Sequence, residues 1–344
     1  LFESNMLGAV EKFNINSTGY RVELYENSGY TEDGSRYDLL ADDVNSEILS
    51  GNGPDIIFGD QEFFAELEKK GELLDLYSMM EADSDFHKDS IIPNILRICE
   101  TDGHLYKLGT GFSLSGFIGA KSLIGDRTGW TVDEFVRLAE SLPKTVTPLE
   151  GSAQSELLRL SLNANMNTYV DSASGTVSFD SEDFRKLLEY AKTYGTDDDT
   201  ETYMPNRSEM IANGELAIAR TGIYSPESYA EAVMEFGEPV SITGFPSQSQ
   251  STISCEMYSM IAISSESMDK EGAWGFVKSL YTEEGQNLLN MRYDIPVVTS
   301  VFEAQITSQL NYNPETGRTR FYDQLGSQQY EDVDLSEGYR NLIY

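Results

Sequence analysis

The segment at residues 50–61, with the sequence SGNGPDIIFGDQ, most constrains what this chain can fold into. Its first glycine can end a preceding helix, and its Gly-Pro pair favours a turn and excludes further helix. The apolar run at residues 56–58 does not alternate, which is typical of a parallel strand covered on both faces. Ligands of open α/β sheets bind just beyond the carboxyl ends of such strands, so Asp60 and Gln61 are candidate ligand contacts. The alternative is an ordinary helix–strand unit that ends in a solvated loop.

Segments with helical and strand-like periodicity alternate along the rest of the chain. We expect helices at residues 2–13, 37–48, 63–70, 131–142, 157–165, 180–194, 208–213, 228–236 and 269–280. Residues 91–99 are expected to form either a short helix or an extended pair. We expect strands at residues 20–25, 56–58, 105–108, 216–219, 240–243 and 258–263. Thr131 and Glu134 form a capping box, Asp180 is the expected N-cap of a later helix, and Trp130 is expected to pack rather than bind. This alternation predicts an α/β fold.

The composition allows about two domains and excludes several function classes. The 344 residues carry 58 acidic and 24 basic side chains, a formal charge of −34, so the basic surface that nucleic-acid binding requires is missing. No apolar run approaches the roughly 20 residues of a membrane span. Two histidines and two cysteines lack the spacing of a zinc site, so we expect no metal, no cofactor and no disulfide between Cys99 and Cys255. Signatures of nucleotide-binding and hydrolytic enzymes are absent, so no catalytic residue is expected.

Four motifs occur in order within residues 37–300. They are GNGPDII at 51–57 followed by KGELLDL at 70–76, then TGWTVDEF at 128–135, GFPS at 244–247, and AIS at 262–264 leading to AWGF at 273–276. Each motif is weak alone, but the ordered set resembles the family 1 extracellular solute-binding proteins of ABC importers, the group that includes the maltose-binding protein.

The resemblance implies a two-lobed periplasmic-binding-protein fold of type II, in which the chain crosses between the lobes three times. We expect an N-terminal lobe from residues 1–109 and 257–304, and a C-terminal lobe from 110–256 and 305–344. The first two crossings are expected in the glycine-rich stretch 109–116 and in the Ser/Gln/Thr-rich stretch 247–256. For the first stretch, the alternative is a tight loop within one lobe.

The same resemblance gives the remaining candidate solute contacts. Tyr224 is similar in position to the aromatic residue on which the family stacks sugars, and Arg220 precedes it at the end of an expected strand. The alternative is that Tyr224 packs on its own lobe. The other candidates follow the first expected strand or lie near the expected crossings, and they are Asn27, Tyr30, Phe112, Tyr258 and Tyr293.

The implied function is capture of an extracellular solute, foremost a carbohydrate or oligosaccharide, for the membrane permease of an ABC importer. The resemblance also implies a monomer held by a lipid anchor on a Gram-positive cell, with the anchor cysteine upstream and further helices downstream of this chain. Two alternatives stay open. One is a glycan-acting enzyme with a carboxylate pair, although 58 acidic residues make chance pairs common. The other is a sensor domain that feeds no transporter.

Overall fold

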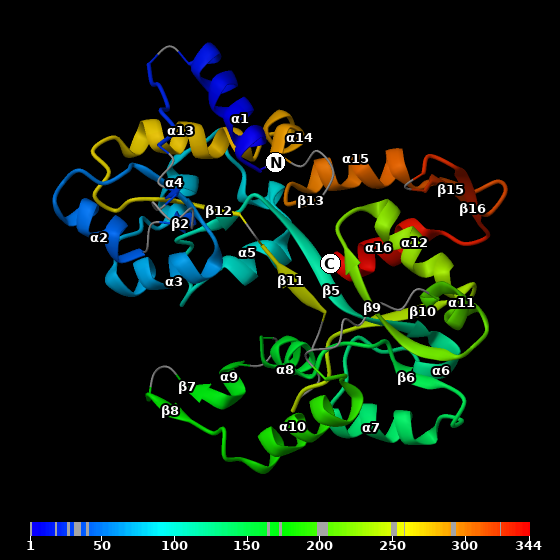
Figure 1. Ribbon diagram of the computed structural model, residues 1–344. Coiled ribbons are helices and arrows are strands. Elements are labelled where there is room, and N and C mark those ends of the chain that lie inside the picture. The colour runs from blue at the N-terminus through cyan, green and yellow to red at the C-terminus, as the bar shows by residue number, and fades with distance from the viewer. Residues whose placement is uncertain are drawn as a thin grey trace. The chain divides into compact units, whose positions relative to one another are not determined.

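A computed structural model gives the fold of most of the chain (Figure 1). It describes residues 2–17, 19–25, 28–30, 36–38, 41–163, 166–171, 174–197, 206–248, 253–257, 259–289, 294–323 and 325–344. No helix in these ranges is long and apolar enough to cross a membrane.

The residue contacts divide the chain into two compact units. Unit 1 contains Leu1–Ser113, Met257–Arg320 and Asp332–Tyr344, and unit 2 contains Leu114–Glu256 and Phe321–Glu331. The C-terminal part differs from our expectation, because residues 305–320 and 332–344 belong to unit 1 and only the short segment between them joins unit 2. The chain therefore passes between the units four times and not three.

The physical reason for this difference is the packing of the last helix, α16 (Leu335–Ile343), against α15 (Thr299–Gln309). The rings of Phe302 and Tyr339 lie 5.4 Å apart, and both side chains are buried. Arg340 donates from Nε and Nη2 to both carboxylate oxygens of Glu303. These contacts hold the C-terminal helix in unit 1.

Unit 1 is built mainly of helices around a small sheet. Its helices are α1 (Phe2–Asn16), α2 (Ala41–Leu49), α3 (Gln61–Lys70), α4 (Leu76–Ala82), the 3-10 helix η1 (Lys88–Ser90), α5 (Pro93–Cys99), α13 (Lys270–Leu280), α14 (Glu283–Leu289), α15 and α16. Its strands are β1 (Ser28–Tyr30), β2 (Arg36–Asp38), β3 (Ile56–Gly59), β4 (Leu108–Gly109), β12 (Met260–Ile263), β13 (Ile295–Pro296) and β14 (Asn311–Asn313).

The central strand of unit 1 is β12, which lies between β3 and β4 and runs antiparallel to both. The prediction of a parallel strand at residues 56–58 is therefore wrong. Of these three residues only Ile57 is buried, so β3 is not covered on both faces as the apolar run indicated. An unalternating run of three residues does not determine strand direction, because direction depends on a partner that lies far along the chain.

Two further expectations for unit 1 are corrected. Residues 20–25 are not a strand, because the side-chain amide of Asn14 accepts from the main-chain nitrogen of Val22 at 2.7 Å and donates to its oxygen at 2.8 Å. The Asn14 side chain thus takes the main-chain N–H and C=O of Val22, which would otherwise bond to a neighbouring strand. The helix expected from residue 37 begins at Ala41, because residues 36–38 form β2 and pair with β1.

Unit 2 has a larger sheet covered by helices. Its helices are α6 (Lys121–Ile124), α7 (Val132–Ser141), α8 (Gln154–Asn163), α9 (Met166–Tyr169), α10 (Glu182–Tyr194), α11 (Arg207–Ala212) and α12 (Pro226–Phe236). Its strands are β6 (Thr147–Leu149), β7 (Val170–Asp171), β8 (Thr176–Val177), β9 (Leu216–Ile223), β10 (Val240–Thr243), β11 (Ser254–Glu256) and β16 (Gln328–Glu331). Two strands begin in unit 1 and end in unit 2, namely β5 (Gly111–Ala120) and β15 (Arg318–Tyr322).

The strand order in the sheet of unit 2 is β10-β5-β9-β6. Strand β6 is parallel to β9, whereas β5 is antiparallel to both β9 and β10. The stretch 109–116 is thus mostly continuous strand and not a tight loop. The aromatic core includes Trp130, whose indole Nε1 donates to the Gly244 oxygen at 2.9 Å, as expected for a packing residue.

Helix α10 shows how a cap can be misplaced by one residue. Its N-cap is Ser181, whose hydroxyl accepts from the main-chain nitrogen of Phe184, and not Asp180 as expected.

The two cysteines are thiols. Cys99 is buried, with its Sγ 3.6 Å from Met257 Sδ, and burial raises the pKa of the Cys99 thiol to about 11.

Candidate functional site

A pocket of about 550 Å³ opens on unit 2. Four segments line it, which are the start of α11, the end of β9, one side of α12 and the turn between β15 and β16. The residues that give it chemical character are Arg207, Arg220, Tyr224, Glu231, Asp323 and Gln329. Arg220 and Tyr224, two of the residues predicted from sequence, are therefore brought together at one pocket.

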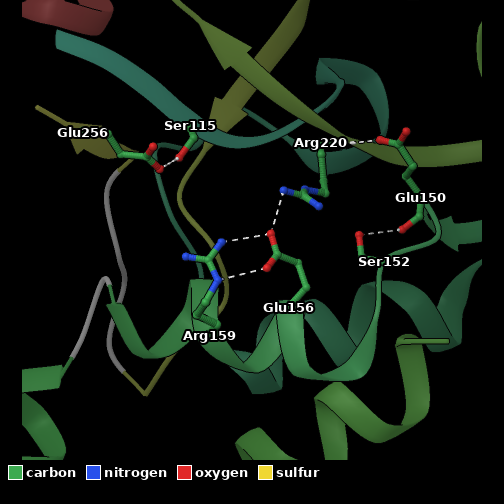
Figure 2. Close-up of polar contacts among 7 residues, drawn as sticks. All are labelled: Ser115, Glu150, Ser152, Glu156, Arg159, Arg220 and Glu256. Carbon is green, nitrogen blue, oxygen red and sulfur yellow. Dashed lines mark hydrogen bonds and ion pairs between the residues drawn. The ribbon is translucent and has the colours of Figure 1, made fainter. Parts of the chain in front are cut away.

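Arg220 lies inside β9, where it pairs with Phe117 of β5. Glu150 directly follows β6, and its main-chain nitrogen donates to the Ile218 oxygen on parallel β9 at 2.8 Å. The Glu150 carboxylate then accepts from the main-chain nitrogen of Arg220 at 2.7 Å (Figure 2). The Ser152 hydroxyl donates to the Glu150 main-chain oxygen at 3.4 Å, which holds the loop that leads to α8.

The Arg220 side chain is oriented by an ion pair with α8. Its Nη2 donates to Glu156 Oε1 at 3.1 Å, and Glu156 also accepts two hydrogen bonds from Arg159 (Figure 2). The hydrogen bonds from Arg159 and the charges of both arginines outweigh partial burial and lower the pKa of Glu156 below its ordinary value. Glu156 is therefore ionised at neutral pH and holds both guanidinium groups.

A second arginine reinforces the same wall of the pocket. Arg207 Nη2 donates to Glu235 Oε2 at 2.9 Å and to the main-chain oxygen of Arg220 at 3.0 Å. Its Nη1 lies 3.7 Å from Glu150 Oε1, and the Ser208 hydroxyl donates to Glu235 Oε1 at 2.8 Å. The arginines and carboxylates thus form one connected network that spans β6, β9, α8, α11 and α12.

Tyr224 is the half-exposed aromatic residue at this pocket, which also includes the buried Phe321. It is half-buried and directly follows Ile223, the last residue of β9, which runs further than the predicted strand 216–219. Its main-chain nitrogen donates to the Ser228 hydroxyl at 3.0 Å, and Ser225 caps the start of α12. These bonds fix the backbone, so the ring is presented by a rigid strand-to-helix turn.

The remaining wall comes from the hairpin of residues 321–331. Asp323 accepts from the main-chain nitrogen of Ser327 at 2.7 Å and of Leu325 at 3.0 Å, and from Gln329 Nε2 at 3.2 Å. These hydrogen bonds, that of Ser327 first, lower the pKa of Asp323. Phe321 is buried at the base of this wall.

A further hydrogen bond in unit 2 ties two strands near the point where the chain leaves the unit. The Ser115 hydroxyl on β5 donates to Glu256 Oε1 on β11 at 2.7 Å (Figure 2).

Across the described ranges, no three His, Cys, Asp or Glu side chains are grouped so that they could hold a metal ion.

The other predicted site residues lie in unit 1 or outside the described ranges. Asp60 is exposed and is the N-cap of α3, where it accepts from the Phe63 nitrogen at 2.9 Å, and Gln61 is the exposed first residue of that helix. Tyr30 ends β1, and its side chain is not among those described. Asn27, Tyr258 and Tyr293 lie outside the described residues.

Phe112 requires a correction, because its side chain is only 1% exposed. It pairs with Ile295 across β5 and β13 and belongs to the core of unit 1, not to a solute-facing surface. A phenylalanine near an expected crossing suggested contact with the solute, whereas Phe112 lies in a strand and is buried.

Sequence reasoning missed the polar residues that surround Arg220 and Tyr224. Glu150 could have been found, since it directly follows a short strand, which is the position that singled out Asp60. No comparable signal marks Asp323 or Gln329, because they reach the pocket only through the late return of the chain to unit 2.

Three solved structures share the fold of this chain. An extracellular solute-binding protein family 1 member from Alicyclobacillus acidocaldarius has a TM-score of 0.56 and 14% identity, over 99% of this chain and 82% of that one. An ABC substrate-binding protein from Listeria monocytogenes, in complex with cycloalternan, has a TM-score of 0.52 and 17% identity, over 88% and 80%. An ABC transporter solute-binding protein from Thermotoga lettingae, bound with alpha-D-tagatose, has a TM-score of 0.51 and 16% identity, over 89% and 81%.

At these identities the likeness establishes the fold alone, a mixed α/β architecture of the two-lobed solute-binding type. The comparison with curated proteins gave no match. The family described as bacterial extracellular solute-binding protein matches residues 8–314, which is most of the chain. The chain therefore belongs to the bacterial extracellular solute-binding proteins, a family of binding proteins rather than enzymes.

Proposed function

We propose that this protein captures a saccharide outside the cell and delivers it to the membrane permease of an ABC importer. The observation that carries the proposal is the pocket of unit 2, which Tyr224 lines together with Arg207, Arg220, Asp323 and Gln329. Sugars present apolar C–H faces and a rim of hydroxyls, which an aromatic ring and planar polar groups can bind together. Two structures of the same fold contain a saccharide, cycloalternan in one and alpha-D-tagatose in the other.

A thermal-shift screen tests the solute class. The panel contains neutral mono- and oligosaccharides, amino acids and polyamines, and hits are followed by isothermal titration. A saccharide at 100 times its dissociation constant should stabilise the protein by about 2.7 kcal/mol. Stabilisation by amino acids or polyamines, with no effect of any saccharide, would contradict the proposal.

Delivery to an importer has its own test. We expect that deleting the gene abolishes uptake of the radiolabelled saccharide that the screen identifies, and that a plasmid copy restores uptake. Unchanged uptake would instead favour a sensor that feeds no transporter.

We also propose a monomer held on a Gram-positive cell by a lipid anchor. Size-exclusion chromatography with light scattering and metabolic labelling with a fatty acid test these two points.

We further propose that the two units act as the lobes of the family and change their arrangement when solute binds. The division of the chain supports this, since unit 2 is entered and left at residues 113–114, 256–257, 320–321 and 331–332. Small-angle X-ray scattering should give a smaller radius of gyration with solute than without it. An unchanged radius at saturation would count against it.

A further inference from the structure

We infer that the pocket of unit 2 takes uncharged saccharides and rejects those that carry a carboxylate or phosphate. This inference rests on the proposed function, and it adds the charge class of the solute. It follows from how the two arginines at the pocket are partnered and from which carboxylates line the same space.

Both arginines at the pocket already have carboxylate partners within the protein. Arg220 pairs with Glu156, with an N–O distance of 3.1 Å, and Arg207 pairs with Glu235 at 2.9 Å. Glu150 lies 3.7 Å from the other terminal nitrogen of Arg207. The positive charge of each guanidinium is therefore already balanced by a carboxylate that the fold holds in place, which weakens the attraction that it can offer to an anionic group on a solute.

The carboxylates at the pocket outnumber the arginines. The lining includes Glu231, Glu235 and Asp323, against Arg207 and Arg220, so its formal charge is about −1. Asp323 stays ionised because the hydrogen bonds from its own turn lower its pKa. An anionic solute would therefore enter a pocket of like charge, which costs binding free energy.

An uncharged polyol meets the opposite situation. Its hydroxyls can donate to the carboxylates of Glu231 and Asp323 and can both donate to and accept from the amide of Gln329. Hydrogen bonds to charged acceptors are stronger than neutral ones, so the carboxylates that exclude an anion favour a sugar hydroxyl.

Paired probes test this inference. A mixture of short neutral oligosaccharides and the same mixture oxidised at C6 to uronic acids are each equilibrated with the full chain, and bound material is measured by mass spectrometry. We expect the neutral members to bind about tenfold or more tightly than their oxidised counterparts. Equal binding of both, or tighter binding of the oxidised members, would overturn the inference while leaving saccharide binding established.

A measurement at high salt distinguishes the effect of the pocket charges from long-range repulsion by the whole chain, whose formal charge is −34. In 1 M salt the screening length is about 3 Å, so long-range repulsion is removed and contacts within the pocket remain. We expect the preference for neutral members to persist in 1 M salt. Its disappearance would assign the preference to net charge and overturn the inference.

A pair of variants locates the effect. Glu231→Gln removes one carboxylate from the pocket, and Glu189→Gln removes one from the exposed face of α10 in the same unit. We expect E231Q to reduce the preference for neutral members several-fold and E189Q to leave it unchanged. An equal preference in both variants would overturn the role of the pocket charges. Binding of neither mixture by the unmodified protein would overturn this inference together with the proposed function.

Discussion

Arg159 donates two hydrogen bonds to Glu156, from Nε to Oε2 and from Nη2 to Oε1, and both measure 3.0 Å. Because Arg159 takes both oxygens from one side, Glu156 is fixed on α8 and can orient the Arg220 guanidinium, which reaches Oε1 at 3.1 Å. The position of Arg220 at the pocket thus depends on a residue that does not line the pocket itself.

Glu156→Gln should weaken solute binding, because Arg220 loses its ionised partner while the side chain keeps its shape. A charge-assisted hydrogen bond contributes about 1.5–3 kcal/mol, and we expect a loss at the lower end of this range by isothermal titration. The control is Glu182→Gln, which removes the carboxylate of the Glu182–Arg185 pair with the same i,i+3 spacing on α10. That pair is exposed, so E182Q should leave affinity unchanged. Equal losses in both variants would mean that Glu156 acts through overall charge.

Tyr224→Ala should weaken binding of the saccharide by about 1–3 kcal/mol, since apolar burial and stacking on the ring are lost. The melting temperature without solute should change little, because the bonds that fix this turn come from the main chain and from Ser228. Tyr322→Ala on β15 is the control, as Tyr322 is 50% exposed and does not line the pocket. Unchanged affinity in Y224A would leave Tyr224 as a packing residue.

Asp83→Asn should destabilise unit 1 in a pH-dependent manner. Asp83 Oδ2 accepts from Lys278 Nζ at 2.6 Å and from Trp274 Nε1 at 2.8 Å. The Lys278 hydrogen bond is the main cause that lowers the pKa of Asp83 from 3.8 to about 2. A lowered carboxyl pKa stabilises the folded state above the ordinary value, and this stabilisation is lost as the pH falls through the folded value.

The measurement for this variant is urea unfolding at several pH values. We expect D83N to lose about 1–3 kcal/mol near pH 7 and the difference from the unmodified protein to shrink between pH 4 and pH 2. A difference that stays constant across this range would show that packing, rather than the charge of Asp83, stabilises the site.

Gly116→Ala and Gly222→Ala form a matched pair in the sheet of unit 2. A Cβ at Gly116 would lie 2.3 Å from the main-chain oxygen of Thr243, whereas a Cβ at Gly222 meets nothing within 4 Å. Backbone cannot give way as a flexible side chain can, so G116A should lower the unfolding free energy by about 1–3 kcal/mol. G222A should have the same unfolding free energy as the unmodified protein. Similar denaturation curves for both alanine variants would contradict the close approach of β5 and β10.

Signals carried by neighbouring residues predicted local structure well. Gly71 ends α3 with a φ of 75°, and the Thr131–Glu134 capping box is present. The Asp-Gly pair at 102–103, a sequence typical of two-residue hairpin turns, forms such a turn with φ values of 52° and 83°. These features depend on dihedral preferences and hydrogen bonds within a few residues, so they can be predicted from the local sequence.

Features that depend on distant residues were not predictable in the same way. The direction of β3 is set by β12, about 200 residues later, and the apolar run of β3 is compatible with either direction. Arg220 and Tyr224 were predicted, since they lie in or directly after a strand that the sequence indicates. Asp323 and Gln329 were not, because nothing near them marks their return to unit 2.

That return also sets the order in which the protein can become able to bind. Unit 2 receives its final segment, residues 321–331, only after the chain has passed once more through unit 1. A ribosome makes residues 114–256 long before Phe321, Asp323 and Gln329 exist, so a nascent chain has an incomplete pocket. The proposed binding pocket is therefore completed late in biosynthesis, and we expect an isolated fragment of residues 114–256 to bind solute more weakly than the intact protein.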